Sequence, residues 1–353
     1  MQRKRVTQKD VAAVAGVSTA TVMRVLYEQG YVAEETRKVV EEAIQRTGYH
    51  VNAVARSLRH QRTTSIGHIL HSLVPNPFFA GVALGVEEEA SRWGWKLLMI
   101  SVRDDERRER LGVETFIQQQ VDAIIFTTPI SEENVQVALD AGIFVVQVER
   151  PTTIPTPSVI VDNYTGAIQA MEHLIALGHK RIAYIGIDPE LLRAQHHFGR
   201  YVEEERLKGY LDSLHKHQIP LNKRFLDLGA HSSFNRTIPL TLSQSLRDMI
   251  VHAERPTAIF ASTDTLAAHV LQQLHDYRLR VPDDISIISF DDTYAPYLTP
   301  PLTTVAQPMM EIGKAAVHLI LDHFQEEPSA LDAFQQKKLA THLVVRSSTA
   351  SIL

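Results

Sequence analysis

Residues 7–26 contain two short helical segments that meet at a glycine, and this pattern limits what the amino-terminal part of the chain can fold into. Thr7 followed three positions later by Asp10 is typical of a helix start, because the two residues can satisfy free backbone donors. Gly16 can adopt the positive φ that ends a helix, and Ser18 is a favourable N-cap for a second helix. The residues that this spacing places inward are Val11, Ala12, Ala15, Val22, Val25 and Leu26. The pattern predicts a helix-turn-helix, whereas a generic pair of packed helices is the alternative.

A third helix is predicted over residues 34–46, with Val40, Ala43 and Ile44 inward. The three helices would form a small all-α headpiece. Residues 1–62 carry eleven Lys and Arg against six Asp and Glu, a net charge of +5, whereas the remainder has a net charge of −10. A basic end on an acidic body concentrates attraction to phosphate at that end, which favours DNA binding over a solvated basic tail.

The second helix is then the natural reader of the major groove of DNA, with its first residues nearest the base edges. Arg24 could bind O6 and N7 of a guanine, and a methyl group of Thr19 or Ala20 could contact a thymine methyl. Ser18 and Thr21 fit better as phosphate contacts, which position the helix without reading sequence. The alternative for Arg24 is an exposed arginine that only attracts phosphate.

From Ser65 onward, short apolar runs rich in β-branched residues alternate with amphipathic stretches. The predicted strands span residues 65–70, 96–101, 122–127, 144–148 and 159–161 in a first series and 181–186, 257–261 and 284–289 in a second. The predicted helices lie near residues 78–93, 105–120, 132–141, 164–177, 203–217, 240–253, 264–277 and 308–325. This alternation predicts parallel sheets with helices on both faces, arranged as an α/β sensor of two doubly wound lobes.

In open α/β sheets, ligands bind outside the carboxyl ends of the strands, and this rule selects candidate residues by position alone. The residues that follow the predicted strands are His71, Leu73, Asn76, Phe78, Phe79, Glu149, Arg150, Asp162, Asn163, Thr263, Asp264, Asp291 and Asp292. Carboxylates that accept hydroxyl protons, beside rings that pack against C–H groups, suit a polyhydroxylated ligand. For Asp162, Asn163 and Asp264 a role as helix N-cap is the alternative. For Phe78 and Phe79 the alternative is a place in the core.

Several classes of protein are disfavoured by what the sequence lacks. It has no cysteine, and therefore no disulfide and no thiolate metal site. No phosphate-binding glycine motif, nucleophile elbow or zinc-protease motif occurs, and the pairs His196-His197 and His215-x-His217 lack a metal-ligand context. We therefore expect no enzyme activity, no catalytic residue, no metal and no cofactor. With no secretory signal and no apolar run of about 18 residues, we expect a cytoplasmic, nucleoid-associated protein without a membrane partner.

These motifs together resemble the lactose/purine repressor family of bacterial transcription regulators. The runs Asp10-Val11-Ala12-x-x-Ala15-Gly16-Val17-Ser18 and Thr21-Val22-x-Arg24-Val25-Leu26 resemble the family's first helix with its turn and its recognition helix. Sensor landmarks include Asn76-Pro77-Phe78-Phe79, Leu177-Gly178-His179-Lys180-Arg181, Phe290-Asp291-Asp292 and Pro301-Leu302-Thr303-Thr304-Val305. The resemblance covers nearly the whole chain and implies a periplasmic-binding-protein-like sensor, with two lobes joined by three crossing segments.

The segment Asn52-x-x-Ala55-Arg56-x-Leu58 resembles the hinge of this family. A helix over residues 52–60 has little more than two turns, so it is marginal alone in water. The resemblance implies that two such helices, one per subunit, pair in the minor groove and insert Leu58 between bases. The alternative is a linker helix. The predicted DNA contacts are Thr7, Ser18, Thr19, Ala20, Thr21, Arg24, Asn52, Ala55, Arg56 and Leu58.

Three positions match residues that bind the effector in relatives: Glu149, Arg206 and Asp291. The chain departs from frequent family residues at Thr263 and Ser289, which bears on the identity of the ligand more than on its location. The predicted effector contacts are Leu73, Asn76, Phe78, Phe79, Glu149, Arg150, Arg206, Thr263, Asp264 and Asp291.

We expect a helix-turn-helix headpiece over residues 1–50, a hinge and linker over 51–63, and an effector-binding and dimerisation domain over 64–353. The lobes of that domain are expected at residues 64–162 with 292–323 and at 163–291 with 324–345. Such a chain would be a homodimeric repressor that reads a palindromic operator under the control of a sugar, sugar phosphate or nucleobase, with dimer versus tetramer left open. The alternatives are a cytoplasmic solute-binding module and an architectural DNA binder without effector control.

Overall fold

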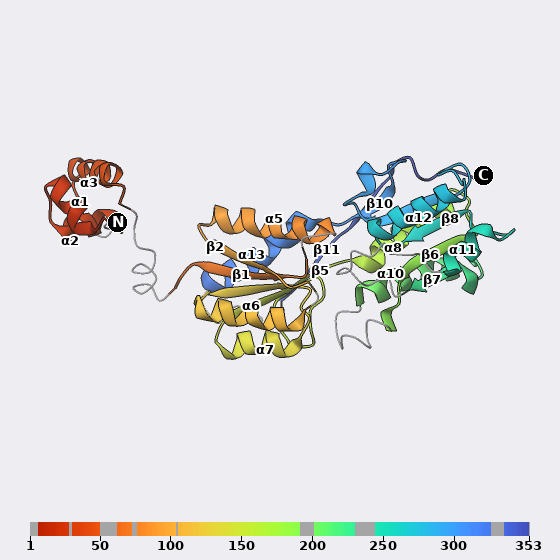
Figure 1. Cartoon of the computed structure of the whole chain (residues 1–353), viewed down its shortest axis with the longest axis horizontal. Coiled ribbons are helices and arrows are strands. Elements are labelled where there is room, and N and C mark those ends of the chain that lie inside the picture. Colours follow the sequence, from red (N-terminus) through yellow and green to blue (C-terminus); the bar gives the residue numbers. More distant parts are fainter. Residues whose placement is uncertain are drawn as a thin grey trace. The chain divides into compact units, whose positions relative to one another are not determined.

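The computed structural model describes residues 6–27, 30–49, 62–72, 76–103, 105–190, 201–229, 244–325 and 335–352 (Figure 1). The chain divides into two compact units, residues 1–63 and 64–353. The predicted hinge contacts and one predicted effector contact lie outside the described residues: Asn52, Ala55, Arg56, Leu58 and Leu73.

Within its described residues, the first unit contains the three predicted helices: α1 (Gln8–Ala15), α2 (Thr19–Leu26) and α3 (Glu34–Thr47). The carboxylate of Asp10 accepts hydrogen bonds from the backbone N–H and the hydroxyl of Thr7, both at 2.7 Å, which fixes the start of α1. Gly16 ends α1 with a φ of 66°, and the Ser18 hydroxyl caps α2 by accepting from the Thr21 N–H. The helices enclose a small core of Val11, Ala12, Ala15, Val22, Val25, Val40, Ala43 and Tyr49. The prediction of a helix-turn-helix headpiece is confirmed.

The second unit begins with a parallel sheet of six strands in the order β11-β5-β4-β3-β1-β2. The strands are β1 (Ser65–Leu70), β2 (Lys96–Ser101), β3 (Ala123–Thr127), β4 (Phe144–Val148), β5 (Ser158–Val161) and β11 (Gln336–Leu339). One face is covered by α5 (Pro77–Arg92) and α13 (Met309–Gln325), and the other by α6 (Glu106–Gln118) and α7 (Glu132–Asp140) (Figure 1). Because both faces are covered, the strands β1, β3 and β5 are buried along their whole length.

A second six-stranded sheet has the order β12-β10-β9-β8-β6-β7 and is parallel except for the β10–β12 pair. Its strands are β6 (Ile182–Ile187), β7 (Leu226–Gly229), β8 (Ala258–Ala261), β9 (Ser286–Asp291), β10 (Thr303–Ala306) and β12 (His342–Val344). One face packs against α8 (Asn163–Ala176) and α10 (Tyr201–Lys216), and the other against α11 (Gln244–Val251) and α12 (Asp264–Asp276). The prediction of two doubly wound lobes is confirmed.

The bounds expected for the lobes need correction. Residues 292–323 were expected in the first lobe, but β10 pairs with β9 in the second sheet, so the chain crosses after residue 306. Residues 324–345 were expected in the second lobe, but β11 pairs with β5 in the first sheet, so the chain crosses back after residue 339. The alternation of strand and helix could not reveal this, because only a short 3-10 turn separates β9 from β10, and β11 is a polar edge strand of four residues.

Candidate functional site

Strained backbone marks the carboxyl ends of three strands. Glu149, directly after β4, has a φ of 70°, and Asp291 and Asp292, at the end of β9, have φ values of 113° and 64°. Thr128, directly after β3, has a φ of 58°. A residue other than glycine is uncommon at a positive φ, where its conformation costs on the order of 1–3 kcal/mol of stability. Such residues are often found at functional sites. The strain therefore coincides with the sheet edges at which ligands bind in this class of fold.

Arg206, on α10, lies at the centre of the polar cluster. Its side chain is 4% exposed, and its Nε donates to the Asn163 Oδ1 at 2.8 Å while its Nη1 donates to the Ser262 carbonyl at 2.6 Å. The same Nη1 lies 3.5 Å from the Asp291 Oδ1, and the guanidinium carbon lies 3.8 Å from the centre of the Phe290 ring. The guanidinium is thus held in one orientation by three elements, as a binding group must be.

Asp291 is the acidic partner of this arginine and is itself buried. Its Oδ1 also accepts a hydrogen bond from the Gln307 Nε2 at 2.6 Å, and Gln307 lies where the chain crosses from β10 to α13. Burial raises the pKa of the Asp291 carboxyl to about 7; the Arg206 guanidinium opposes this rise, and the Asp264 carboxylate adds to it. The Asp291 carboxyl therefore titrates near neutral pH.

The free energy of unfolding should depend on whether Asp291 carries a proton. The unfolded carboxyl ionises near pH 3.8, whereas the folded carboxyl keeps its proton to about pH 7, so folding gains stability from this group at low pH and loses it as pH rises to about 7. Asp291→Asn should therefore gain stability relative to wild type between pH 4 and pH 7, by up to about 4 kcal/mol. Urea unfolding at several pH values measures the difference. Asp276→Asn, at an exposed position, is the control, and parallel pH curves for wild type and Asp291→Asn would contradict this expectation.

Glu149 and Arg150 are the residues that the first lobe contributes to the cluster. Burial raises the pKa of Glu149, and the guanidinium groups of Arg150 and Arg206 oppose that rise. Arg150 donates from both terminal nitrogens to the two oxygens of Glu203 at 2.5 Å. Glu203 was not predicted from the sequence. Its spacing of three residues from Arg206, which places both side chains on one face of α10, is the signal that could have found it.

The side chains of other predicted effector contacts make hydrogen bonds or packing contacts within the protein. Asp264 is fully buried and does not cap α12; Thr263 does, by accepting from the Leu266 N–H at 3.2 Å. The Asp264 carboxylate instead accepts from the Ser289 hydroxyl at 2.6 Å and from backbone N–H groups at the start of the following loop. These donors are Thr293, Tyr294 and Ala295, at 2.6, 2.9 and 3.1 Å. Asp264 therefore anchors the loop after β9 and does not present a free carboxylate.

In the first lobe, the two aromatic residues predicted as effector contacts lie in the hydrophobic core, which is the alternative that the sequence offered. Phe78 and Phe79 are 3% and 7% exposed and belong to the core beneath α5. Asn76 caps α5 by accepting from the Phe78 N–H at 3.0 Å. Asp162 caps α8 in the same way, by accepting from the Thr165 N–H. The structure thus brings together Glu149, Arg150, Asn163, Arg206 and Asp291. The side chains of Asn76 and Asp264 bond backbone N–H groups, and Phe78 and Phe79 pack in the core.

The predicted DNA-reading face of α2 is open to solvent. Thr19, Ala20 and Arg24 are exposed, and none of them belongs to the headpiece core. The hydroxyls of Ser18 and Thr21 lie 2.9 Å apart at the start of the helix. The start of α2 therefore carries two hydroxyl groups, and its exposed face carries one cationic side chain. A helix that reads the major groove needs groups of both kinds.

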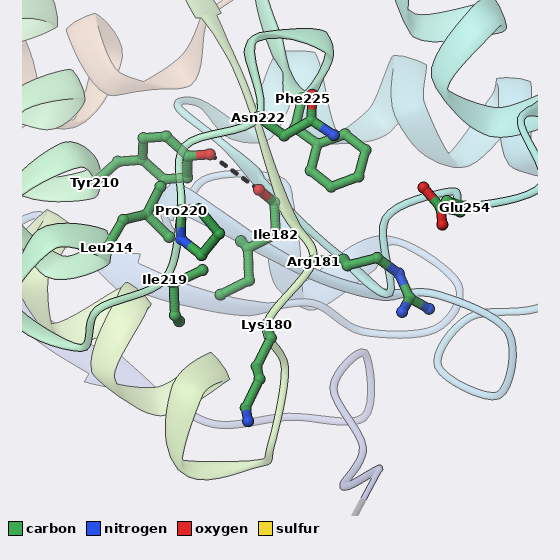
Figure 2. A pocket seen from close by; sticks show the side chains of 10 residues that line it. All are labelled: Lys180, Arg181, Ile182, Tyr210, Leu214, Ile219, Pro220, Asn222, Phe225 and Glu254. Carbon is green, nitrogen blue, oxygen red and sulfur yellow. Dashed lines mark hydrogen bonds between the residues drawn. The ribbon is translucent and has the colours of Figure 1, made fainter.

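A cavity lies away from this cluster, in the second lobe (Figure 2). Its volume is about 160 Å³, and it lies at the amino end of β6, the edge opposite to that of the polar cluster. Its apolar wall includes Ile182, Leu214 and Phe225, and the Tyr210 hydroxyl donates to the Ile182 carbonyl. This cavity is therefore not the predicted effector site.

In the part of the chain that the structure describes, no group of three or more acidic or histidine side chains is arranged to hold a metal ion. His217 bonds the Glu172 carboxylate at 2.9 Å, which accounts for one of the predicted surface histidines, whereas His196 and His197 lie outside the described residues. None of the helices within the described ranges is long and apolar enough to cross a bilayer.

Residues 7–52 match the protein family described as bacterial regulatory proteins, lacI family, and residues 171–349 match the periplasmic binding protein-like domain. The chain is 31% identical over 321 residues to the ribose operon repressor of Haemophilus influenzae, which covers 90% of this chain and 92% of that protein.

Two solved structures extend this likeness to the fold. The lac repressor dimer bound to operator and the anti-inducer ONPF matches with a TM-score of 0.80 and 25% identity, over 99% of this chain and 100% of that chain. The complex of the transcriptional regulator CelR with cellobiose matches with a TM-score of 0.67 and 27% identity, over 98% of this chain and 100% of that chain.

Proposed function

Because the chain belongs to the lacI family of bacterial regulatory proteins, it is a DNA-binding transcription regulator and not an enzyme, and we propose that it is a repressor whose operator affinity is controlled by a small molecule. One observation carries the proposal. A single chain holds a helix-turn-helix unit with an exposed second helix and a two-lobed sensor with a buried polar cluster at the ends of its strands.

The effector is a polyhydroxylated molecule, a sugar or a sugar derivative. Glu149, Arg206 and Asp291 offer two carboxyl groups and a fixed guanidinium, which suit hydroxyl groups as hydrogen-bond partners. The solved relatives with bound cellobiose and with the anti-inducer ONPF support this class of ligand. Nucleobases and sugar phosphates remain the compounds to test beside neutral sugars.

The protein acts as a homodimer on a palindromic operator. A two-fold protein reads two half-sites spaced by about one helical turn, ~34 Å, and the lac repressor relative is a dimer on its operator. Residues 51–63 are the hinge that couples the sensor to the headpiece. A ligand that favours one arrangement of the lobes shifts the population of hinges able to bind DNA.

The proposal is tested by selecting preferred sequences from a random DNA pool with the full-length protein, then titrating sugars, sugar phosphates and nucleobases against the selected DNA. We expect a palindromic target and a change in its affinity with one class of compound. A solute-binding module would select no sequence, and an architectural DNA binder would select a target that no compound affects.

Replacing Arg24 by alanine should cost about 1–3 kcal/mol of binding free energy at the selected target and should relax the preferred sequence, because a bidentate contact to guanine carries base discrimination. Fluorescence anisotropy on the target and on single-base variants measures both effects. Arg46→Ala, at an exposed position on α3, is the matched control. An equal loss for Arg24→Ala on every DNA would show that Arg24 contacts phosphate only.

A further inference from the structure

One ion pair joins the two lobes of the sensor away from the segments that cross between them. Arg150 lies two residues beyond β4 of the first sheet, and Glu203 lies on α10, which covers the second sheet. Both terminal nitrogens of the Arg150 guanidinium, Nη1 and Nη2, donate to the carboxylate of Glu203. By contrast, the pair Lys216–Glu172 stays within the second lobe.

This ion pair is less exposed to water, and more strictly oriented, than an ordinary surface ion pair. The side chain of Glu203 is 6% exposed and that of Arg150 is 22% exposed, so water screens their attraction only weakly. Two parallel hydrogen bonds between a guanidinium and a carboxylate fix the relative orientation of the groups as well as their distance. Any motion that separates the end of β4 from α10 must break both bonds and leave a nearly buried carboxylate without its cation.

The pair also lies next to the groups proposed to bind the effector. Arg150 follows Glu149 in the chain, and Glu203 precedes Arg206 by one helical turn. Holding Arg150 against Glu203 therefore holds Glu149 beside Arg206 and Asp291, whose charges already affect one another.

We propose that Glu203 is a positioning residue that holds Arg150 and thereby favours the arrangement of the two lobes in which this ion pair is formed, which we call closed. The effector then binds to lobes that are already mostly closed, and the strength of this ion pair sets the fraction of protein that is ready to bind it. The proposal concerns the motion of the sensor and does not depend on which DNA or which effector the protein binds.

The lack of cysteine allows a direct test, because two introduced cysteines can be labelled without background. Gln118→Cys on α6 and Gln272→Cys on α12 are exposed positions, one in each lobe. Single-molecule energy transfer on full-length protein, with labelled chains diluted in unlabelled chains, reports the distance between lobes without added ligand. We expect one dominant distance in the wild type and a longer-distance population in Glu203→Gln, with the ratio of closed to open protein lowered about tenfold.

Two controls separate positioning from general damage. Glu172→Gln removes a carboxylate that pairs within the second lobe and should leave the distances unchanged. The exchange variant Arg150→Glu with Glu203→Arg should restore the closed population. Unchanged distances in Glu203→Gln, or no recovery in the exchange variant, would overturn the proposal.

Discussion

Arg206→Ala should abolish the effector response while the protein still binds its operator. The substitution removes the donor to Asn163 and to the Ser262 carbonyl, and it leaves the buried Asp291 without its cation. Truncating one partner of a buried, hydrogen-bonded charge pair across an interface costs about 2–5 kcal/mol of binding free energy, so the loss of the guanidinium should lower effector affinity by about 30-fold or more. The headpiece is a separate compact unit, so its contacts with DNA should survive.

The measurement is operator affinity by anisotropy at increasing effector concentration, with thermal unfolding of each variant to verify that it is folded. Arg206→Lys keeps the charge but not the planar fork and should recover only a small part of the response. Arg247→Ala, an exposed arginine on α11, is the matched control. A normal response in folded Arg206→Ala would exclude this arginine from the effector site.

Asp264→Asn should destabilise the sensor strongly even though it changes one atom. Both carboxylate oxygens of Asp264 accept hydrogen bonds, from Ser289 and Thr304 on one side and from the backbone after β9 on the other. An amide has one accepting oxygen and no charge, so one set of donors loses its acceptor and the other loses a charged one. Hydrogen bonds to charged groups contribute about 1.5–3 kcal/mol each. We expect a loss of about 3 kcal/mol or more in the free energy of unfolding.

Urea unfolding of the full chain measures this loss, and Asp276→Asn at the exposed end of α12 gives the background. A second consequence is specific to the loop. Because Asp264 holds the N–H groups of residues 293–295, the strained Asp291 and Asp292 just before them should lose their fixed positions, and effector affinity should fall along with stability. Stability and effector affinity both equal to wild type would show that the loop is held by other contacts.

Much of the candidate site followed from position in the sequence. The rule that ligands bind at the carboxyl ends of strands selected Glu149, Asn163 and Asp291, and the family resemblance added Arg206. The same rule also selected Asp264 and Phe79, which have the right position in the chain but turn into the fold. Position along a strand says which edge a residue reaches, not which neighbours its side chain meets there.

What the sequence determined by itself is local. Thr7 and Ser18 at helix starts, Gly16 at a helix end and the alternation of strand and helix depend on residues a few positions apart, so they can be read directly. Only the tertiary structure decided that β10 joins the second sheet, that Asp264 holds a loop some thirty residues away, and that Arg150 meets Glu203 across the lobes. These contacts join distant parts of the chain, and their partners are chosen by packing and by the need to satisfy buried charge, which no local pattern records.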